Sequence, residues 1–111
     1  MKALSIEQMN QLKELGIDVK PKGTCLMYTS DSSDNYYLKY GESTCEDDIK
    51  AFSLQDLIEL LPIENIDVRR NCHERWIMSY KNEISFKYEF LIDAAYQMLI
   101  WVIENGYLKT K

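Results

Sequence analysis

The sequence predicts an α+β protein, and three observations support that fold class. Two short segments carry helix-capping signals, two pairs of strand-like segments flank polar turns, and the C-terminal run Leu91 to Gly106 has helical length and strong apolar character. Local antiparallel pairing with helices laid on the strands is a two-layer α+β arrangement. We therefore predict the order helix, hairpin, helix, hairpin, helix, with helices packed mainly on one face of an antiparallel sheet.

The first two helices are predicted from their caps. In Leu4 to Gly16, Ser5 is a suitable N-cap and Gln8 stands three residues later, which is the spacing of a capping box. The same pattern recurs in Phe52 to Pro62, with Ser53 as the N-cap. Glycine after the first helix and proline after the second are typical stop signals.

The strands are predicted from composition and turn residues. Thr24 to Thr29 and Tyr36 to Tyr40 flank the turn-favouring letters DSSDN, and Ile66 to Arg70 and Trp76 to Lys81 flank NCHE. Ile84 to Phe90 alternates apolar and polar residues as a strand does, yet it leads directly into the last helix. We interpret its first part as a short strand or extended arm, and a helix start is the alternative.

The C-terminal helix has apolar residues around much of its circumference. A surface helix shows an apolar stripe a little over about 100° wide, so this helix needs cover on two or more sides. Trp101 is predicted to be a core anchor, and Ile92, Tyr96 and Ile100 lie on the opposite flank. Either the two short helices or a second copy of the chain covers that flank, so these three are candidate interface residues.

Length and charge bound the function classes. The 111 residues fit one domain, residues 1–111, with a single core. The net charge of −5 disfavours a duplex nucleic-acid binder, which would present a basic surface. The first residues lack a signal-length apolar run, and the C-terminal run is too short and interrupted to span a bilayer. We therefore expect a cytoplasmic protein that binds neither nucleic acid nor membrane.

The chemistry-bearing residues predict no enzyme, metal or cofactor. Cys25, Cys45 and Cys72 are an odd number without a close pair, which is typical of reduced, packed thiols. A zinc site with His73 is the alternative, but Cys72 and His73 are adjacent, and structural zinc ligands stand a few residues apart. The same adjacency disfavours a nucleophile and base pair.

All three arginines and the single histidine fall within seven residues, RRNCHER. Because the guanidinium fork binds carboxylates and phosphates, Arg69, Arg70, His73 and Arg75 are candidates for an anion site or for docking an acidic partner. The alternative is a solvated turn, since Arg69 and Arg70 diverge on a strand.

Tyrosines and acids form two further candidate surfaces. Tyr36 and Tyr37 are neighbours on a strand and face opposite sides, so at least one can lie outside the core, as interface tyrosines do. A half-buried strand that uses tyrosine for its β propensity is the alternative. The acids lack the spacing of a calcium loop, and Asp47 and Asp48 are expected to favour the N-terminus of the next helix. The acidic residues concerned are Asp31, Asp34, Glu42, Glu46, Asp47 and Asp48.

Two segments, AFSLQDLIELLP and LIDAAYQMLIWVIENGYLKT, resemble small uncharacterised proteins of bacterial prophages and mobile elements, which also begin with a helix like SIEQMNQLKELG. The resemblance implies an accessory role and transfers no catalytic residue. Together with the residues above, it predicts a small accessory protein that acts through protein–protein contacts and self-associates. An anion or acidic-peptide binding module that uses the arginine hairpin is the alternative.

Overall fold

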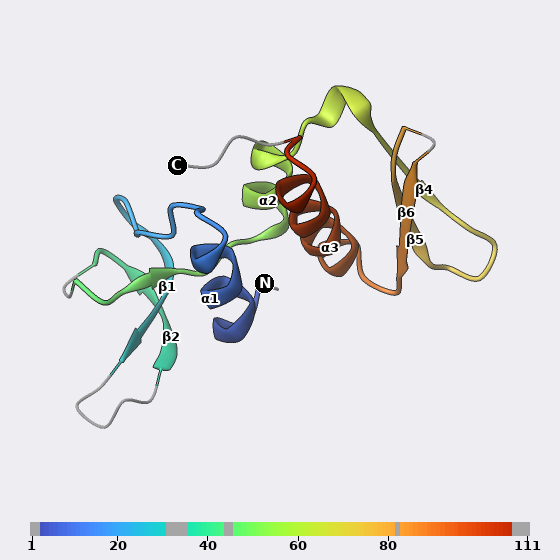
Figure 1. The fold of residues 1–111 in the computed structure, drawn as a ribbon. Helices are drawn as coiled ribbons and strands as arrows, with labels where there is room; N and C mark the ends of the chain where they lie inside the picture. The colour runs from blue at the N-terminus through green and yellow to red at the C-terminus, as the bar shows by residue number, and fades with distance from the viewer. Residues whose placement is uncertain (1–2, 31–35, 44–45, 82, 108–111) are drawn as a thin grey trace. The chain divides into compact units, whose positions relative to one another are not determined.

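A computed structural model describes residues 3–30, 36–43, 46–81 and 83–107, and it confirms the α+β class (Figure 1). The described chain forms two compact units, Ala3–Phe52 and 53–107, each with its own three-stranded antiparallel sheet. The elements in chain order are α1 (Ile6–Glu14), β1 (Cys25–Ser30), β2 (Tyr36–Gly41), β3 (Ile49–Lys50), α2 (Leu54–Leu60), the 3-10 turn η1 (Ile63–Asn65), β4 (Ile66–Arg70), β5 (Trp76–Tyr80), β6 (Ile84–Tyr88) and α3 (Leu91–Glu104).

The predicted order needs a correction, because each predicted hairpin gains a third strand. β3 pairs with the side of β1 that β2 leaves open, and β6 pairs with the far side of β5. The order is therefore helix, three strands, helix, three strands, helix, and the strands form two sheets. A physical reason is that an isolated two-stranded hairpin is marginally stable in water, and a third strand adds pairing and a wider face.

In the first unit, α1 begins at the predicted cap. The Gln8 amide donates to Ser5 Oγ at 3.2 Å, and the Ser5 amide donates to Gln8 Oε1 at 2.9 Å. These bonds satisfy two amides that the start of a helix leaves open. Met9 and Leu12 are buried on the inner side of the helix. Leu4 precedes the cap and donates its amide to the Phe52 carbonyl at 2.9 Å, which joins the two ends of this unit.

The sheet of the first unit has the strand order β2-β1-β3. The central strand β1 carries its buried residues Met27 and Thr29 on one face, two residues apart as the strand repeat requires. The edge strand β3 is only two residues long, and its Lys50 amide donates to the Val19 carbonyl at 2.8 Å. The opposite edge is β2.

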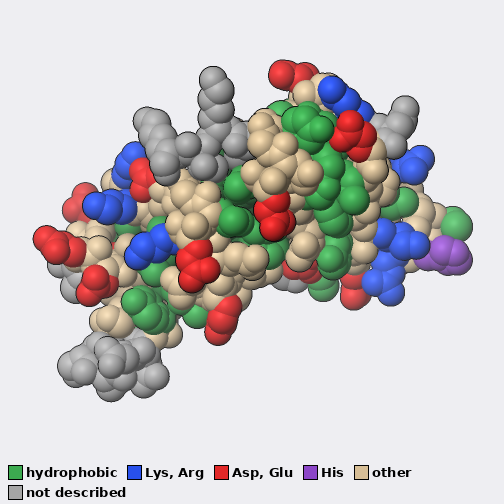
Figure 2. All heavy atoms as spheres, viewed as in Figure 1, with side chains coloured by type: hydrophobic (Ala, Val, Ile, Leu, Met, Phe, Trp, Pro, Cys, Tyr) green, Lys and Arg blue, Asp and Glu red, His purple; other side chains and the backbone are tan. Residues whose placement is uncertain are grey.

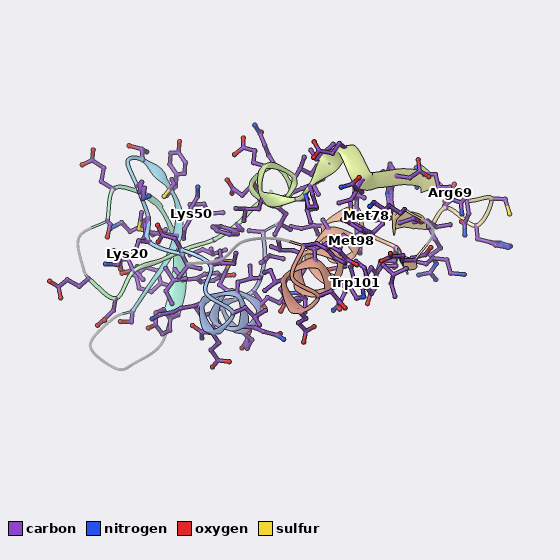
Figure 3. The ribbon with its side chains drawn as sticks, turned by 45° about the horizontal axis from the view of Figure 1, so that its top comes forward. Lys20, Lys50, Arg69, Met78, Met98 and Trp101 are labelled. Carbon is purple, nitrogen blue, oxygen red and sulfur yellow. The ribbon has the colours of Figure 1, made fainter. Side chains whose placement is uncertain are left out.

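In the second unit, α3 packs against β5 and β6, and α2 packs against α3. Met78 on β5 and Met98 on α3 are fully buried, and Figure 3 shows both with Trp101. The Trp101 ring lies 5.2 Å from the Tyr80 ring and 5.4 Å from the Tyr107 ring, measured between centroids. Trp101 itself is half-buried, so the predicted core anchor is an aromatic contact at the margin of the core.

The sheet of the second unit has the strand order β4-β5-β6, with β5 in the centre. In this register Val68, Met78 and Phe86 stand side by side across the three strands, and so do Asp67, Ser79 and Ser85. Because the ring contact with α3 comes from Tyr80, the Met78 row shares the face that meets the helix. The Asp67 row lies on the opposite, polar face. Alternation in the sequence does not decide whether 84–90 forms a strand or begins a helix. In the structure, β6 runs from Ile84 to Tyr88.

Candidate interaction surfaces

The tip of the arginine hairpin is organised by one side chain. Asn71 Oδ1 accepts hydrogen bonds from the backbone amides of His73 at 3.0 Å and Arg75 at 2.9 Å. The Asn71 carbonyl accepts from the Glu74 amide at 3.1 Å, and Glu74 has a φ of 61°. Asparagine commonly bonds to the backbone two residues on, and it starts such turns readily. The loop therefore holds its shape through backbone contacts and leaves His73 and Arg75 exposed.

The arginines do not converge on one site. The Arg70 guanidinium lies over the ring of its cross-strand partner Trp76, with 5.3 Å from Cζ to the ring centroid. Arg69 is exposed on the opposite, polar face of the strand, as alternation predicts. Figure 2 shows basic side chains beside the single histidine, at the tip of this hairpin. The predicted anion or acidic-partner site stays a prediction. Two of its members, Arg69 and Arg70, lie on opposite faces of β4.

A shallow pocket of about 450 Å³ lies on the polar face of the second sheet. Two of its lining residues, Ser79 and Ser85, have hydroxyl oxygens 3.0 Å apart. Its rim carries charges of both signs, so no single-sign field favours an anion or a cation. The charged lining residues are Asp67, Arg69, Lys81 and Glu83.

The edge strand β2 exposes large apolar side chains. The exposed fractions are 40% for Tyr36, 52% for Tyr37, 49% for Leu38 and 74% for Tyr40. Tyr36, Leu38 and Tyr40 share one face, whereas Tyr37 shares the other face with Lys39. The sequence predicts that at least one of Tyr36 and Tyr37 can lie outside the core; both are exposed, and Leu38 extends the surface. Their role in an interface stays a prediction. We call these five residues, 36–40, the β2 edge.

Three tyrosine hydroxyls are held in the protonated form. Burial raises the pKa of Tyr28, and the nearby Glu7 carboxylate raises it further. The Tyr28 hydroxyl donates to the Leu4 carbonyl at 2.7 Å, so it is a structural contact of the first unit. Burial also raises the pKa of Tyr96, and the Glu83 carboxylate raises the pKa of Tyr107. None of these shifts marks a proton-transfer site.

The candidate interface residues of the last helix are corrected by their burial. Ile92, Tyr96 and Ile100 are each at most 8% exposed. The wide apolar surface of α3 did require cover, as the sequence indicated, and the folded chain already supplies it. These three residues are therefore core residues and do not belong to an exposed partner surface.

The cysteines and acids form no metal site within the described residues. Cys25 is half-buried and Cys72 is exposed, both as free thiols. Among described residues, no group of three or more histidine, cysteine or acidic side chains could hold a metal ion. Cys45, Asp31 and Asp34 lie outside the described residues.

The expectation for Asp47 and Asp48 is corrected. They precede strand β3, and the acid in the first turn of α2 is Asp56. Asp48 is buried, and its Oδ2 accepts from Ser43 Oγ at 2.9 Å. It is a structural contact in the loop before β3. Glu42, Glu46 and Asp47 are exposed.

Comparisons with known proteins do not connect this chain to a family. No family model, curated protein or solved structure matches it. The resemblance to prophage proteins stays a prediction. In the described part of the chain, no helix has the length and apolar character needed to cross a membrane.

Proposed function

We propose that this protein acts by protein–protein contact, and that the β2 edge pairs with an extended segment of a partner chain. The single observation that carries the proposal is the exposure of Tyr36, Tyr37, Leu38 and Tyr40 on the open edge of a sheet. An extended partner can add a strand to such an edge, where main-chain hydrogen bonds supply affinity and alternate side chains supply specificity. The accessory role predicted from the sequence agrees with a protein that works by binding.

The make-up of the strand supports this proposal. Natural edge strands are protected by charges, proline, shortness or a covering segment, because an open edge recruits other strands. β3 is protected by its shortness and by its bond to Val19. β2 is six residues long and carries one charge, Lys39. Tyrosine is also enriched in protein interfaces, because it combines a large apolar ring with a polar tip.

Selection of short random peptides displayed on phage tests this proposal. We expect immobilised protein to enrich peptides with alternating apolar residues, because one side of an added strand would face Tyr36, Leu38 and Tyr40. The Leu38→Lys variant should lose this binding. The matched control is Val68→Lys, because Val68 is 43% exposed on β4, an edge strand of the other sheet.

Binding of an enriched peptide is then located by amide chemical shifts in solution. Shifts that concentrate on residues 36–41 and vanish in Leu38→Lys support strand addition. Peptides that bind Leu38→Lys as well as wild type would place the contact elsewhere and refute the proposal. The absence of any enriched peptide, together with equal self-association of wild type and Leu38→Lys, would also refute it.

A further inference from the structure

We infer that the strand received by the β2 edge is β2 of a second copy of this chain, paired antiparallel with Leu38 opposite Leu38. This inference rests on the proposed function and names its partner. An antiparallel pair of identical strands is two-fold symmetric, so one surface serves both copies and the assembly closes as a dimer.

Symmetry limits the registers to a few. In a two-fold antiparallel pair, the residue at the axis faces itself, and its neighbours pair at equal distances on either side. For the β2 edge the central candidates are Tyr37, Leu38 and Lys39. A centre at Lys39 puts two ammonium groups directly opposite each other, which is destabilising. A centre at Tyr37 sets Tyr40 beyond the start of the opposing strand.

A centre at Leu38 uses the whole β2 edge, because the letters YYLKY are complementary to themselves in reverse. Tyr36 then faces Tyr40 of the other copy, and these aromatic pairs flank the Leu38 pair on one face of the sheet. On the other face Tyr37 meets Lys39, so each ammonium has an aromatic ring as its cross-strand neighbour. In this register the Lys39 charge, which would otherwise discourage pairing at this edge, has a favourable neighbour.

The strands of the second sheet do not combine this complementarity with exposure. β4 reads IDVRR, and self-pairing about its centre Val68 would set Asp67 opposite Arg69 but Ile66 opposite Arg70. β6 reads ISFKY, and self-pairing about Phe86 would set Ile84 opposite Tyr88, but these apolar residues are half-buried on the face that packs against α3. On the other face of β6, Ser85 would stand opposite Lys87. Pairing through β2 instead produces one six-stranded sheet of order β3-β1-β2-β2-β1-β3.

Sedimentation equilibrium of the full chain tests the inference. Wild type is expected to form a dimer whose population rises with concentration. Leu38→Lys should raise the dissociation constant by roughly tenfold or more, because the apolar pair is lost and two charges face each other. Val68→Lys should associate as wild type does. A wild-type chain that stays monomeric at millimolar concentration, or a Leu38→Lys dimer of unchanged strength, overturns the inference.

A cysteine cross-link tests the register. Directly opposed residues bring their Cβ atoms close enough for a disulfide after a small adjustment. In chains with the native cysteines changed to serine, Leu38→Cys should cross-link quickly under mild oxidation, and Tyr37→Cys and Val68→Cys should cross-link slowly. Faster cross-linking of Tyr37→Cys than of Leu38→Cys would contradict this register.

The two proposals fail in different ways. If phage peptides bind the β2 edge while the chain stays monomeric, the proposed function stands, the inference is wrong, and the partner is another protein. If no peptide is enriched and wild type and Leu38→Lys associate equally, both are wrong. A dimer that is lost in Leu38→Lys and linked through Leu38→Cys supports both, since the second copy is then the protein bound.

Discussion

β2 and β4 are both edge strands of three-stranded antiparallel sheets, and their side chains differ sharply in character. β2 carries three tyrosines and a leucine with one lysine, whereas β4 carries Asp67, Arg69 and Arg70 among five residues. Charges on an edge strand discourage pairing with other chains. The β4 edge of the second sheet is therefore protected by charge, whereas the β2 edge of the first sheet is receptive.

The central strands of the two sheets, in contrast, are alike. Met27 on β1 and Met78 on β5 are both fully buried. Met27→Ala and Met78→Ala should each lower the free energy of unfolding by about 2 to 5 kcal/mol, because each leaves a cavity and loses apolar contacts. Urea unfolding followed by circular dichroism measures both. A loss under about 1 kcal/mol in either variant would break the similarity between the two centres.

On the first sheet, the hydrogen bond of Tyr28 is expected to stabilise the unit. Tyr28→Phe removes the hydrogen bond to the Leu4 carbonyl and should cost about 0.5 to 1.5 kcal/mol of unfolding free energy. The exposed Tyr37→Phe is the matched control and should leave the unfolding free energy of dilute protein unchanged. Equal losses in both variants would show that the Leu4 contact does not stabilise this unit.

The same tyrosine predicts a pH dependence. Its pKa in the folded protein is raised above the ordinary value of 10.0, so the folded state holds the phenol proton more tightly than the unfolded state does. Its contribution to stability is therefore complete below pH 10 and is lost as the pH rises from 10 through the folded pKa. Tyr28→Phe should show a shallower alkaline decline than wild type, and identical declines would contradict the assignment.

At the hairpin tip of the second sheet, one substitution is expected to increase stability. Glu74 adopts a φ of 61°, where a side chain other than glycine is strained. Glu74→Gly should raise the free energy of unfolding by up to about 1 kcal/mol, the relief of strain less the added entropy of glycine in the unfolded chain. Arg75→Gly, at a residue without positive φ, should show no gain. A lower stability in Glu74→Gly would indicate that its side chain has a contact of its own.

The smallest effects are expected at the two edges. Tyr40→Ala and Val68→Ala remove exposed side chains and should stay within about 0.5 kcal/mol of wild type in dilute solution. Repeating thermal melts at rising concentration separates the edges, because only a β2 variant should lose a concentration-dependent increase in Tm. If Tm depends on concentration in the same way for Tyr40→Ala and Val68→Ala, β2 and β4 do not differ in their tendency to pair.

The parts of the fold that could be predicted from sequence are those determined by nearby residues. Both capping boxes were predicted at Ser5 and Ser53, because a cap depends on residues three positions apart. β3 could not be predicted, since two residues carry no alternation and depend on distant pairing with β1. Because the sequence does not reveal β3, it predicts that Asp47 and Asp48 lie at the start of the following helix, whereas β3 stands between them and α2.

The candidate surface was predictable only in part. Alternation indicated that Tyr36 and Tyr37 could not both be buried, but nothing local indicates whether a strand is central or at an edge. That distinction made Leu38 part of the surface and was set by the pairing of β1 with β3. The wide apolar surface of α3 correctly indicated a need for cover, whereas the identity of the cover depends on tertiary packing around Ile92 and Tyr96.

The bond from the Lys50 amide to the Val19 carbonyl sets the limit on how large an assembly can grow. Sheets with two receptive edges add strands without end, and such growth leads to fibrils. Here the far edge of the first sheet is two residues long and already bonded to its own chain. Pairing through β2 therefore consumes the single receptive edge of that sheet, and the product is finite.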